Sequence, residues 1–323
     1  MSEPIHPYAI YTTEEAAKLL RVSIATIQRY IRSKKLQAIQ IGKWYRISGR
    51  VLIDFMSLDY KSVNTSFQRV RAMEDANYWR SISFLMSTSQ GKQYLELFDL
   101  SSQMLLGLYE PTHMSDENEL TIKYIIARVF NHGVIAYRNA LSGYYQASYA
   151  MQRDLIEVAF LADYFRSNAE KIAEWRVATN DERISKFSPN VLYKKLDKRD
   201  GFTEAKRKIM YQQYCEYATH VSYPGIKLLT NDENLVEIGP FYNENKLINT
   251  IHDLVRNFGS TPVYLGIHIK IKKARTFKLI LEHMDKFDRV YNLKTTESEE
   301  FKRRRASIED NIKRLIEIER QKK

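Results

Sequence analysis

The stretch YTTEEAAKLLRVSIATIQRYIRSKKLQAIQIGKWYRI, residues 11–47, carries no acidic residue after Glu15. From Ala16 to Ile53 the chain has nine Lys or Arg and not one Asp or Glu. A solvated globular surface normally mixes both signs of charge. A window of one sign this long predicts a surface that faces a negatively charged partner.

The same stretch contains the start signals of two short helices. Thr12 and Glu15 fit a capping box, and an apolar face follows at residues 16–20. Residues 21–22 predict a tight turn, after which Ser23 is a natural N-cap. In the second helix Ile27 and Ile31 point inward. Four polar residues are left facing out, namely Thr26, Gln28, Arg29 and Arg32. Two short helices, a tight turn and a basic second helix predict a helix-turn-helix.

A β-hairpin is expected directly after the second helix. Residues 38–41 and 45–47 are β-prone and alternate, with Gly42, Lys43 and Trp44 between them. Ser48 can cap a last short helix that carries Val51, Leu52 and Phe55. The hairpin therefore predicts a wing whose tip carries Lys43 and Trp44.

These residues resemble the excisionase/MerR-like family of winged helix-turn-helix domains. The matching segments are YTTEEAAKLLRVSIATIQRYIRS and LQAIQIGKWYRI. The resemblance implies that the helix at 23–32 enters the major groove and that the wing contacts the flanking backbone. It also implies DNA contacts by Thr26, Arg29 and Tyr30 on the helix and by Lys43, Tyr45 and Arg46 in the wing. With the other polar residues of the helix, the expected DNA-binding residues are Ser23, Thr26, Gln28, Arg29, Tyr30, Arg32, Lys43, Tyr45 and Arg46.

Two positions depart from the family pattern. The family usually has Gly after the second helix and Pro before the first strand, where this chain has Lys34 and Gln37. Lys34 can adopt the left-handed conformation at a cost of roughly 1 kcal/mol. Alternatively, the turn is remodelled and the wing takes a different angle.

The rest of the chain predicts a mainly α protein. Gly and Pro are few, at 11 and 7 of 323 residues, which favours long helices. Four regions are expected: the winged helix-turn-helix at 8–57, a linker that becomes helical at 58–80, an all-α domain at 81–293 and a charged helical tail at 294–323. A small hairpin is expected around residues 231–234. The tail has apolar residues at heptad-like steps, and it could pack on the body, pair with a second chain or project as a basic helix.

The helical domain holds candidate residues for chemistry. Arg153 and Glu157 stand four residues apart on one expected helix, and His220 lies near a later helix end. Such groups could act on a phosphodiester, with His as acid or base and Arg at the developing charge. The domain is distantly similar to the HEPN ribonucleases, whose signature is an Arg followed by His on one helix. Here Arg128 precedes His132 with three residues between, one short of the usual minimum. The simpler interpretation is a structural ion pair, without catalysis.

Composition bounds the remaining properties. The formal net charge of +11 favours nucleic acid or anionic lipid as a partner. The one cysteine, Cys215, excludes an intramolecular disulfide and a Cys-rich zinc site. We expect no metal, no cofactor and no membrane span, and a cytoplasmic location. A basic stretch at 269–276, IKIKKART, is either a second nucleic-acid contact or a solvated edge.

The sequence thus favours a sequence-specific double-stranded DNA-binding protein, not an enzyme, that forms a homodimer. Its role would be transcription regulation or that of an excisionase-like factor in a mobile element. Two alternatives stay open. One is a helical HEPN-like nuclease that the N-terminal domain targets to DNA, and the other is a protein-interaction adaptor.

Overall fold

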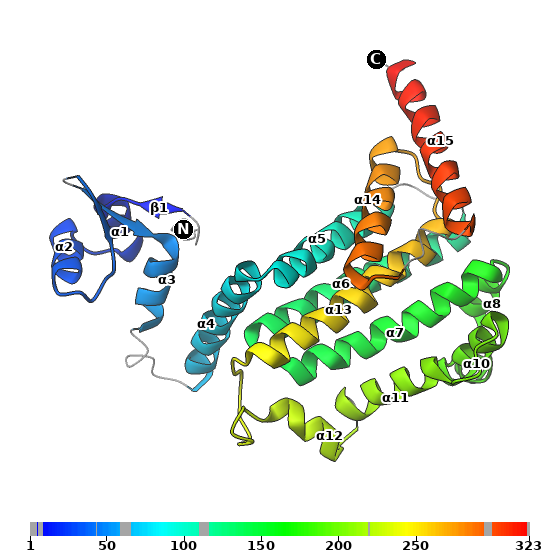
Figure 1. Cartoon of the computed structure of the whole chain (residues 1–323), viewed down its shortest axis with the longest axis horizontal. Helices are drawn as coiled ribbons and strands as arrows, with labels where there is room; N and C mark the ends of the chain where they lie inside the picture. The colour runs from blue at the N-terminus through cyan, green and yellow to red at the C-terminus, as the bar shows by residue number, and fades with distance from the viewer. Residues whose placement is uncertain are drawn as a thin grey trace. The chain divides into compact units, whose positions relative to one another are not determined.

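A computed structural model describes residues 5, 9–42, 44–58, 66–109, 116–218, 220–293 and 299–321. The chain divides into two compact units, Met1–Ala76 and Asn77–Lys323, and each is described here by itself. Figure 1 shows a small α/β unit followed by a larger unit of long helices. The expected fold class, mainly α with a winged helix-turn-helix, is confirmed.

The first unit combines short helices with a three-stranded antiparallel sheet in the order β1-β3-β2. Its elements are β1 (Ile10–Tyr11), α1 (Thr13–Leu20), α2 (Ile24–Arg32), β2 (Ile39–Ile41), β3 (Trp44–Ser48) and α3 (Gly49–Leu58). The buried core is made by Ala16, Ala17, Ile27, Leu36, Ile47 and Leu52. Helices α1, α2 and α3, strand β3 and the connection after α2 each contribute one or two of these residues, so the small core depends on all of them.

Local signals of the sequence set the ends of the first two helices. The capping box is present: Glu15 N–H donates to Thr12 Oγ1 at 3.2 Å, and Thr12 N–H donates to Glu15 Oε2 at 2.8 Å. Arg21 ends α1 in the left-handed region, with φ of 54°. Lys34 adopts the left-handed conformation with φ of 58°, as the first of the two alternatives predicted. Strand β1 was not predicted, because two residues are too few to show a period.

The second unit is a helical assembly around α7. Its elements are the later part of α4 (Ser66–Ser87), α5 (Ser89–Tyr109), α6 (Glu117–Ser142), α7 (Tyr145–Ser167), α8 (Lys171–Val177), α9 (Asn180–Phe187), α10 (Pro189–Asp200), α11 (Lys206–Ala218), α12 (Tyr223–Ile226), α13 (Glu244–Leu265), α14 (Ala274–Tyr291) and α15 (Glu299–Gln321), with 3₁₀ turns at Lys227–Leu229 and Gly266–His268. Helix α7 packs against α6, α13, α11 and α10, and α5 packs against α13, α14 and α6.

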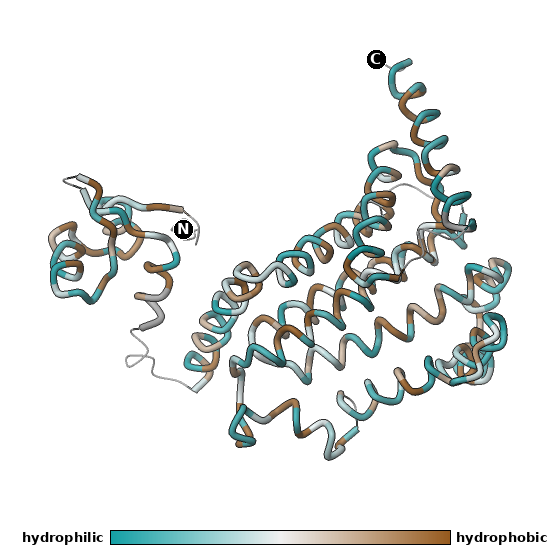
Figure 2. The backbone as a smooth tube through the Cα atoms, in the orientation of Figure 1, coloured by the Kyte–Doolittle hydropathy of each residue, from teal (hydrophilic) through white to brown (hydrophobic). Residues whose placement is uncertain are grey.

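Both apolar and polar contacts tie these helices together. Phe258 of α13 is fully buried and stacks on Phe98 of α5, with ring centroids 4.8 Å apart. The buried Gln152 of α7 donates to the carbonyl of Thr250, and Asn257 donates to Tyr214 Oη at 2.8 Å. Figure 2 shows that hydrophobic and hydrophilic residues alternate along the helices, as amphipathic helices require.

The hairpin expected around 231–234 is reduced to one antiparallel bridge, between Thr230 and Val236. The turn itself is present, because Asn231 Oδ1 accepts from the N–H groups of Glu233 and Leu235. Within the described residues no strand of two or more residues forms here. The side chain of Asn231 satisfies backbone donors that a longer ladder would otherwise use.

The C-terminal tail is helical and packs on the body of its own chain. Ile308 of α15 is buried, and Arg304 Nη2 donates to the carbonyl of Val263 at 2.9 Å. Arg305 forms an ion pair with Asp285 of α14. Of the three arrangements expected for the tail, the structure shows packing on the body. None of the helices in the described ranges is long and apolar enough to cross a bilayer.

Candidate DNA-binding surface

Helix α2 is held by its cap and by one buried side chain. Ser23 Oγ accepts from the N–H of Thr26 at 3.1 Å and lies 2.9 Å from the Thr26 hydroxyl. Ile27 is fully buried under the helix. Both hydroxyls therefore take part in the cap. The cap and Ile27 together fix which face of α2 turns to solvent.

The outward face of α2 carries a pair of cations. Arg29 and Arg32 are exposed, and Gln28 and Thr26 are half-buried beside them. Arg29 and Arg32 stand three residues apart and therefore share one face of the helix. Arginine can donate two hydrogen bonds to guanine or to phosphate, and glutamine can do the same for adenine. The outward face of α2 thus carries residue types that can pair with base edges or phosphates.

Tyr30 has a packing role in addition to its expected contact with DNA. Its ring lies 5.1 Å from that of Phe55 in α3, centroid to centroid, and it packs against the core. The guanidinium of Arg29 lies 5.9 Å from the Tyr30 ring. Tyr30 thus joins α2 to α3 and supports the position of Arg29.

The wing pairs β2 with β3, in a register that matches Ile39 with Arg46 and Ile41 with Trp44. Ile39, Ile41 and Trp44 are 71%, 60% and 63% exposed and share one face of the hairpin with Arg46. Tyr45 is half-buried and lies on the opposite face of the hairpin, which it shares with the buried Ile47. Lys43 lies outside the described residues.

Three further cations near α2 were not among the expected DNA-binding residues. Arg21, Lys34 and Lys35 are exposed at the two ends of the helix. All three lie in the acid-free window, but the charge of the window alone did not distinguish them from its other cations. The nearest acid in sequence is at the start of α1. There, backbone and Thr12 hydrogen bonds, with a smaller effect of Arg46, lower the pKa of Glu14.

In the second unit the expected pair of Arg153 and Glu157 is present. Arg153 Nη2 lies 2.7 Å from Glu157 Oε1, and the two side chains are 30% and 29% exposed. Arg153 also donates to Tyr211 Oη at 2.7 Å, and Tyr211 donates to Glu157 at 2.8 Å. Burial, and then the Glu157 carboxylate, raise the pKa of Tyr211. His220 is exposed, and among the described residues no contact joins its side chain to Arg153 or Glu157.

A second polar group joins α6 to α7. Arg128 Nε donates to Asp154 Oδ2 at 3.0 Å, and His132 Nδ1 lies 2.6 Å from the same carboxylate oxygen. The histidine contact has the distance of an ion pair without the angle of an aligned hydrogen bond. In the sequence, the spacing of Arg128 and His132 is one residue short of the HEPN signature, and neither was among the candidate catalytic residues. Nothing in that spacing indicated Asp154, which comes from the next helix.

These features define the first unit as a helix-turn-helix domain with a wing. Residues 10–57 match the model of a family described as "Helix-turn-helix domain", and this match supports DNA binding. No curated protein and no solved structure matches the chain significantly.

Proposed function

We propose that the chain is a sequence-specific double-stranded DNA-binding protein of the excisionase/MerR-like type. It would act as a transcription regulator or as an excisionase-like factor of a mobile element. One observation carries the proposal: the exposed face of α2 presents Arg29 and Arg32, within a window of nine cations and no acid. A carboxylate in that window would repel the DNA backbone, whereas each cation placed there releases condensed counterions.

Two kinds of contact follow from the placement of these side chains. Arg29, on the exposed face, and the half-buried Gln28 beside it would read base edges in the major groove. Arg21, Lys34 and Lys35 lie at the ends of the helix, where phosphates flank a bound α2. The exposed Ile41 and Trp44 of the wing would pack on the sugars beside the site. Phosphate contacts would supply most of the affinity, and the α2 contacts most of the specificity.

The first experiment measures binding of the intact protein to duplex DNA over a range of salt concentrations by fluorescence anisotropy. If about four to six phosphates are neutralised, log K against log salt has a slope of about −3 to −6. A genome-wide binding map of the same protein should give sharp peaks with a common motif. A slope near zero, with no peaks, would instead favour the protein-interaction adaptor.

The larger unit is proposed to serve oligomerisation or sensing. A single small winged domain rarely binds tightly alone, and operators with two-fold symmetry reward dimers. We therefore propose a homodimer in which each chain supplies one α2 to a half-site.

A second candidate function is phosphodiester hydrolysis by the helical unit. It is supported by His132 beside Asp154, an arrangement in which a carboxylate can orient an imidazole as general base. Arg128 donates to the same carboxylate and could stabilise developing charge. The Arg153–Glu157 pair lies on α7, the helix that carries Asp154.

The test combines labelled RNA and DNA substrates with thermal melts of two variants. If the unit is a nuclease, His132→Gln abolishes cleavage and leaves the melting temperature unchanged. Arg153→Ala should then also stop cleavage without unfolding the protein. If Arg153 instead belongs to a structural pair, its loss costs about 1–3 kcal/mol, less than for a fully buried pair. Absence of cleavage by the wild-type protein would remove this candidate.

A further inference from the structure

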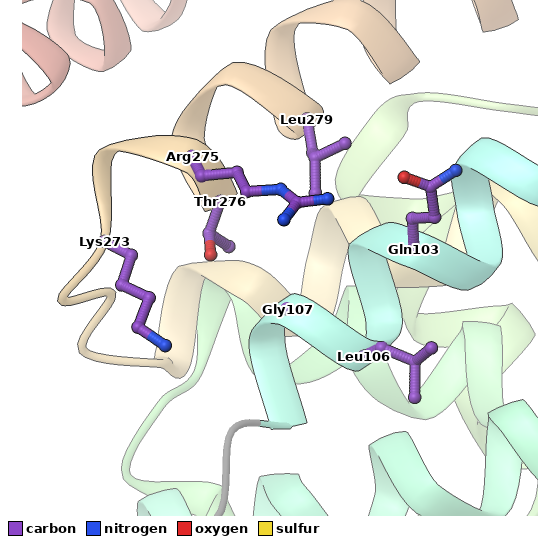
Figure 3. A pocket seen from close by; sticks show the side chains of 7 residues that line it. All are labelled: Gln103, Leu106, Gly107, Lys273, Arg275, Thr276 and Leu279. Carbon is purple, nitrogen blue, oxygen red and sulfur yellow. The ribbon is translucent and has the colours of Figure 1, made fainter.

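A cavity of 340 Å³ lies between α5 and α14 of the helical unit. Figure 3 shows the seven residues that line it. Helix α5 contributes Gln103, Leu106 and Gly107, and the start of α14 contributes Lys273, Arg275, Thr276 and Leu279. Ligand pockets in proteins range over roughly 300–1,000 Å³, so this one admits a small molecule.

Gly107 keeps the cavity open. A Cβ at this position would come within 3.2 Å of Thr276 Oγ1 and 3.3 Å of its methyl group. A side chain here would therefore press on α14 and fill the floor of the cavity. The absence of a side chain brings the backbone of α5 close to the Thr276 hydroxyl, which points toward it in Figure 3.

Thr276 is a largely buried residue whose hydroxyl is accessible from the cavity that it lines. Its side chain is 4% exposed, and its hydroxyl makes no hydrogen bond to any residue in the described part of the chain. Because Thr276 lines the cavity, a molecule bound there can supply the missing partner.

Two cations stand on either side of this hydroxyl. Figure 3 shows the Lys273 side chain on one side of Thr276 and the Arg275 guanidinium on the other. Arg275 is exposed, and no acidic partner for it occurs within the described ranges. A carboxylate lies nearby: Glu319 of α15 accepts from the N–H of Ala274 at 3.2 Å. Because this bond occupies one N–H of the first turn of α14, a molecule in the cavity would bind mainly to side chains.

We propose that this cavity binds a small molecule that carries a phosphate group. Arg275 would pair with the phosphate oxygens, Lys273 would add positive charge beside them, and the Thr276 hydroxyl would donate to a further oxygen. The positive end of the α14 dipole favours the same charge. A flat ring of the ligand, such as a nucleotide base, would lie between Leu106 and Leu279. Gln103 donates its amide N–H to Asp99 at 2.7 Å, which leaves its carbonyl to accept from the ligand.

The site would give the helical unit a sensing role that does not depend on DNA binding. The ligand contacts α5 on one side and α14 on the other, two helices that also pack on each other. A ligand that binds both helices in the folded state stabilises their packing by mass action. Ligand binding and the melting temperature of the intact protein should therefore rise together.

The test is isothermal titration calorimetry on the full chain, with inorganic phosphate and the four nucleoside 5′-monophosphates as probes. We expect saturable binding of one equivalent per chain, with at least one nucleotide tighter than phosphate alone. Arg275→Ala should weaken binding about tenfold, and Thr276→Val, which keeps the shape of the side chain, about three- to tenfold. Lys278→Ala, on the same helix and outside the cavity, is the control with a matched charge and should change nothing.

Several results would overturn the proposal. Equal weakening by Lys278→Ala and Arg275→Ala would show general attraction to a basic surface. Absence of saturable phosphate binding, with variants that melt like the wild type, would show that the cavity holds no anion. Binding of DNA or RNA oligonucleotides through Arg275, without binding of mononucleotides, would make the stretch at 269–276 a nucleic-acid contact. Nucleotides no tighter than phosphate would exclude a ligand body between Leu106 and Leu279.

Discussion

Arg29 and Lys35 differ in what each can contact on DNA, although both are exposed cations of the first unit. Arg29 lies on the outward face of α2, and Lys35 lies beyond its end. We expect Arg29→Ala to cost about 1–3 kcal/mol on the specific site and to relax sequence preference. Lys35→Ala should weaken binding to all sequences alike and reduce the salt slope by about 1.

Anisotropy titrations on one specific and one random duplex separate these two effects. Lys92→Ala, an exposed cation of the helical unit outside the acid-free window, is the control. Equal losses on both duplexes for Arg29→Ala would show that Arg29 reads no base.

His283 makes the stability of the helical unit depend on pH. Its ring is fully buried, its Nε2 lies 3.0 Å from Ser101 Oγ, and burial lowers its pKa to about 4. The unfolded chain binds a proton near pH 6.5. Between pH 6.5 and 4 the unfolded state therefore holds more protons, and stability falls as the pH falls. The loss should approach about 3 kcal/mol at pH 4.

Urea unfolding of the wild type and of His283→Gln between pH 4 and 7 measures this effect. The difference between the two free energies of unfolding should shrink toward low pH, because His283→Gln removes the titrating group. His220→Gln, at an exposed histidine, should follow the wild-type pH dependence. Parallel curves for His283→Gln and the wild type would mean that His283 is not buried as a neutral ring.

At the scale of elements, Gly133 is required by close helix packing, whereas Gly201 is required by its backbone conformation. A Cβ at Gly133 of α6 would lie 2.3 Å from the Phe258 ring of α13. We expect Gly133→Ala to cost about 1–3 kcal/mol through overpacking. Gly201 ends α10 with φ of +68° and has open space around it. Gly201→Ala should cost about 1 kcal/mol through backbone strain.

A double mutant distinguishes the two causes. Phe258→Leu should relieve part of the cost of Gly133→Ala, so that the two changes are not additive. The same change should add to Gly201→Ala without coupling. Thermal or urea unfolding of the five variants provides the free energies. Full additivity at Gly133 would contradict close packing of α6 on α13.

At the scale of the whole molecule, the proposed homodimer predicts the stoichiometry of binding. A dimer with two α2 helices requires half-sites about 34 Å apart, or about 10 base pairs from centre to centre. Sedimentation equilibrium of the intact protein with such a duplex should show two chains per duplex. Inserting about five base pairs between the half-sites would place them on opposite faces and weaken binding. One chain per duplex at saturation would contradict a dimer.

The sequence by itself determined the helix-turn-helix in nearly every part. The caps at Thr12 and Ser23 and the inward position of Ile27 follow from contacts within a few residues, whereas the conformation of Lys34 was left open between two alternatives. Such contacts obey fixed spacings, so a sequence shows them directly. The expected DNA-binding residues of α2 are placed on or beside one surface for the same reason, although Tyr30 is partly a core residue.

Only the tertiary structure decided which distant residues meet. The buried Asp163 of α7 pairs with Arg199 of α10, with Oδ2 and Nη2 2.9 Å apart. His132 of α6 contacts Asp154 of α7. The cavity likewise combines Gly107 of α5 with Thr276 of α14. These contacts depend on how amphipathic helices choose partners, and the apolar periodicity of one helix does not name the helix it packs on. The sequence therefore revealed the locally encoded helix-turn-helix, while the polar clusters and the cavity of the helical unit arise from packing between helices.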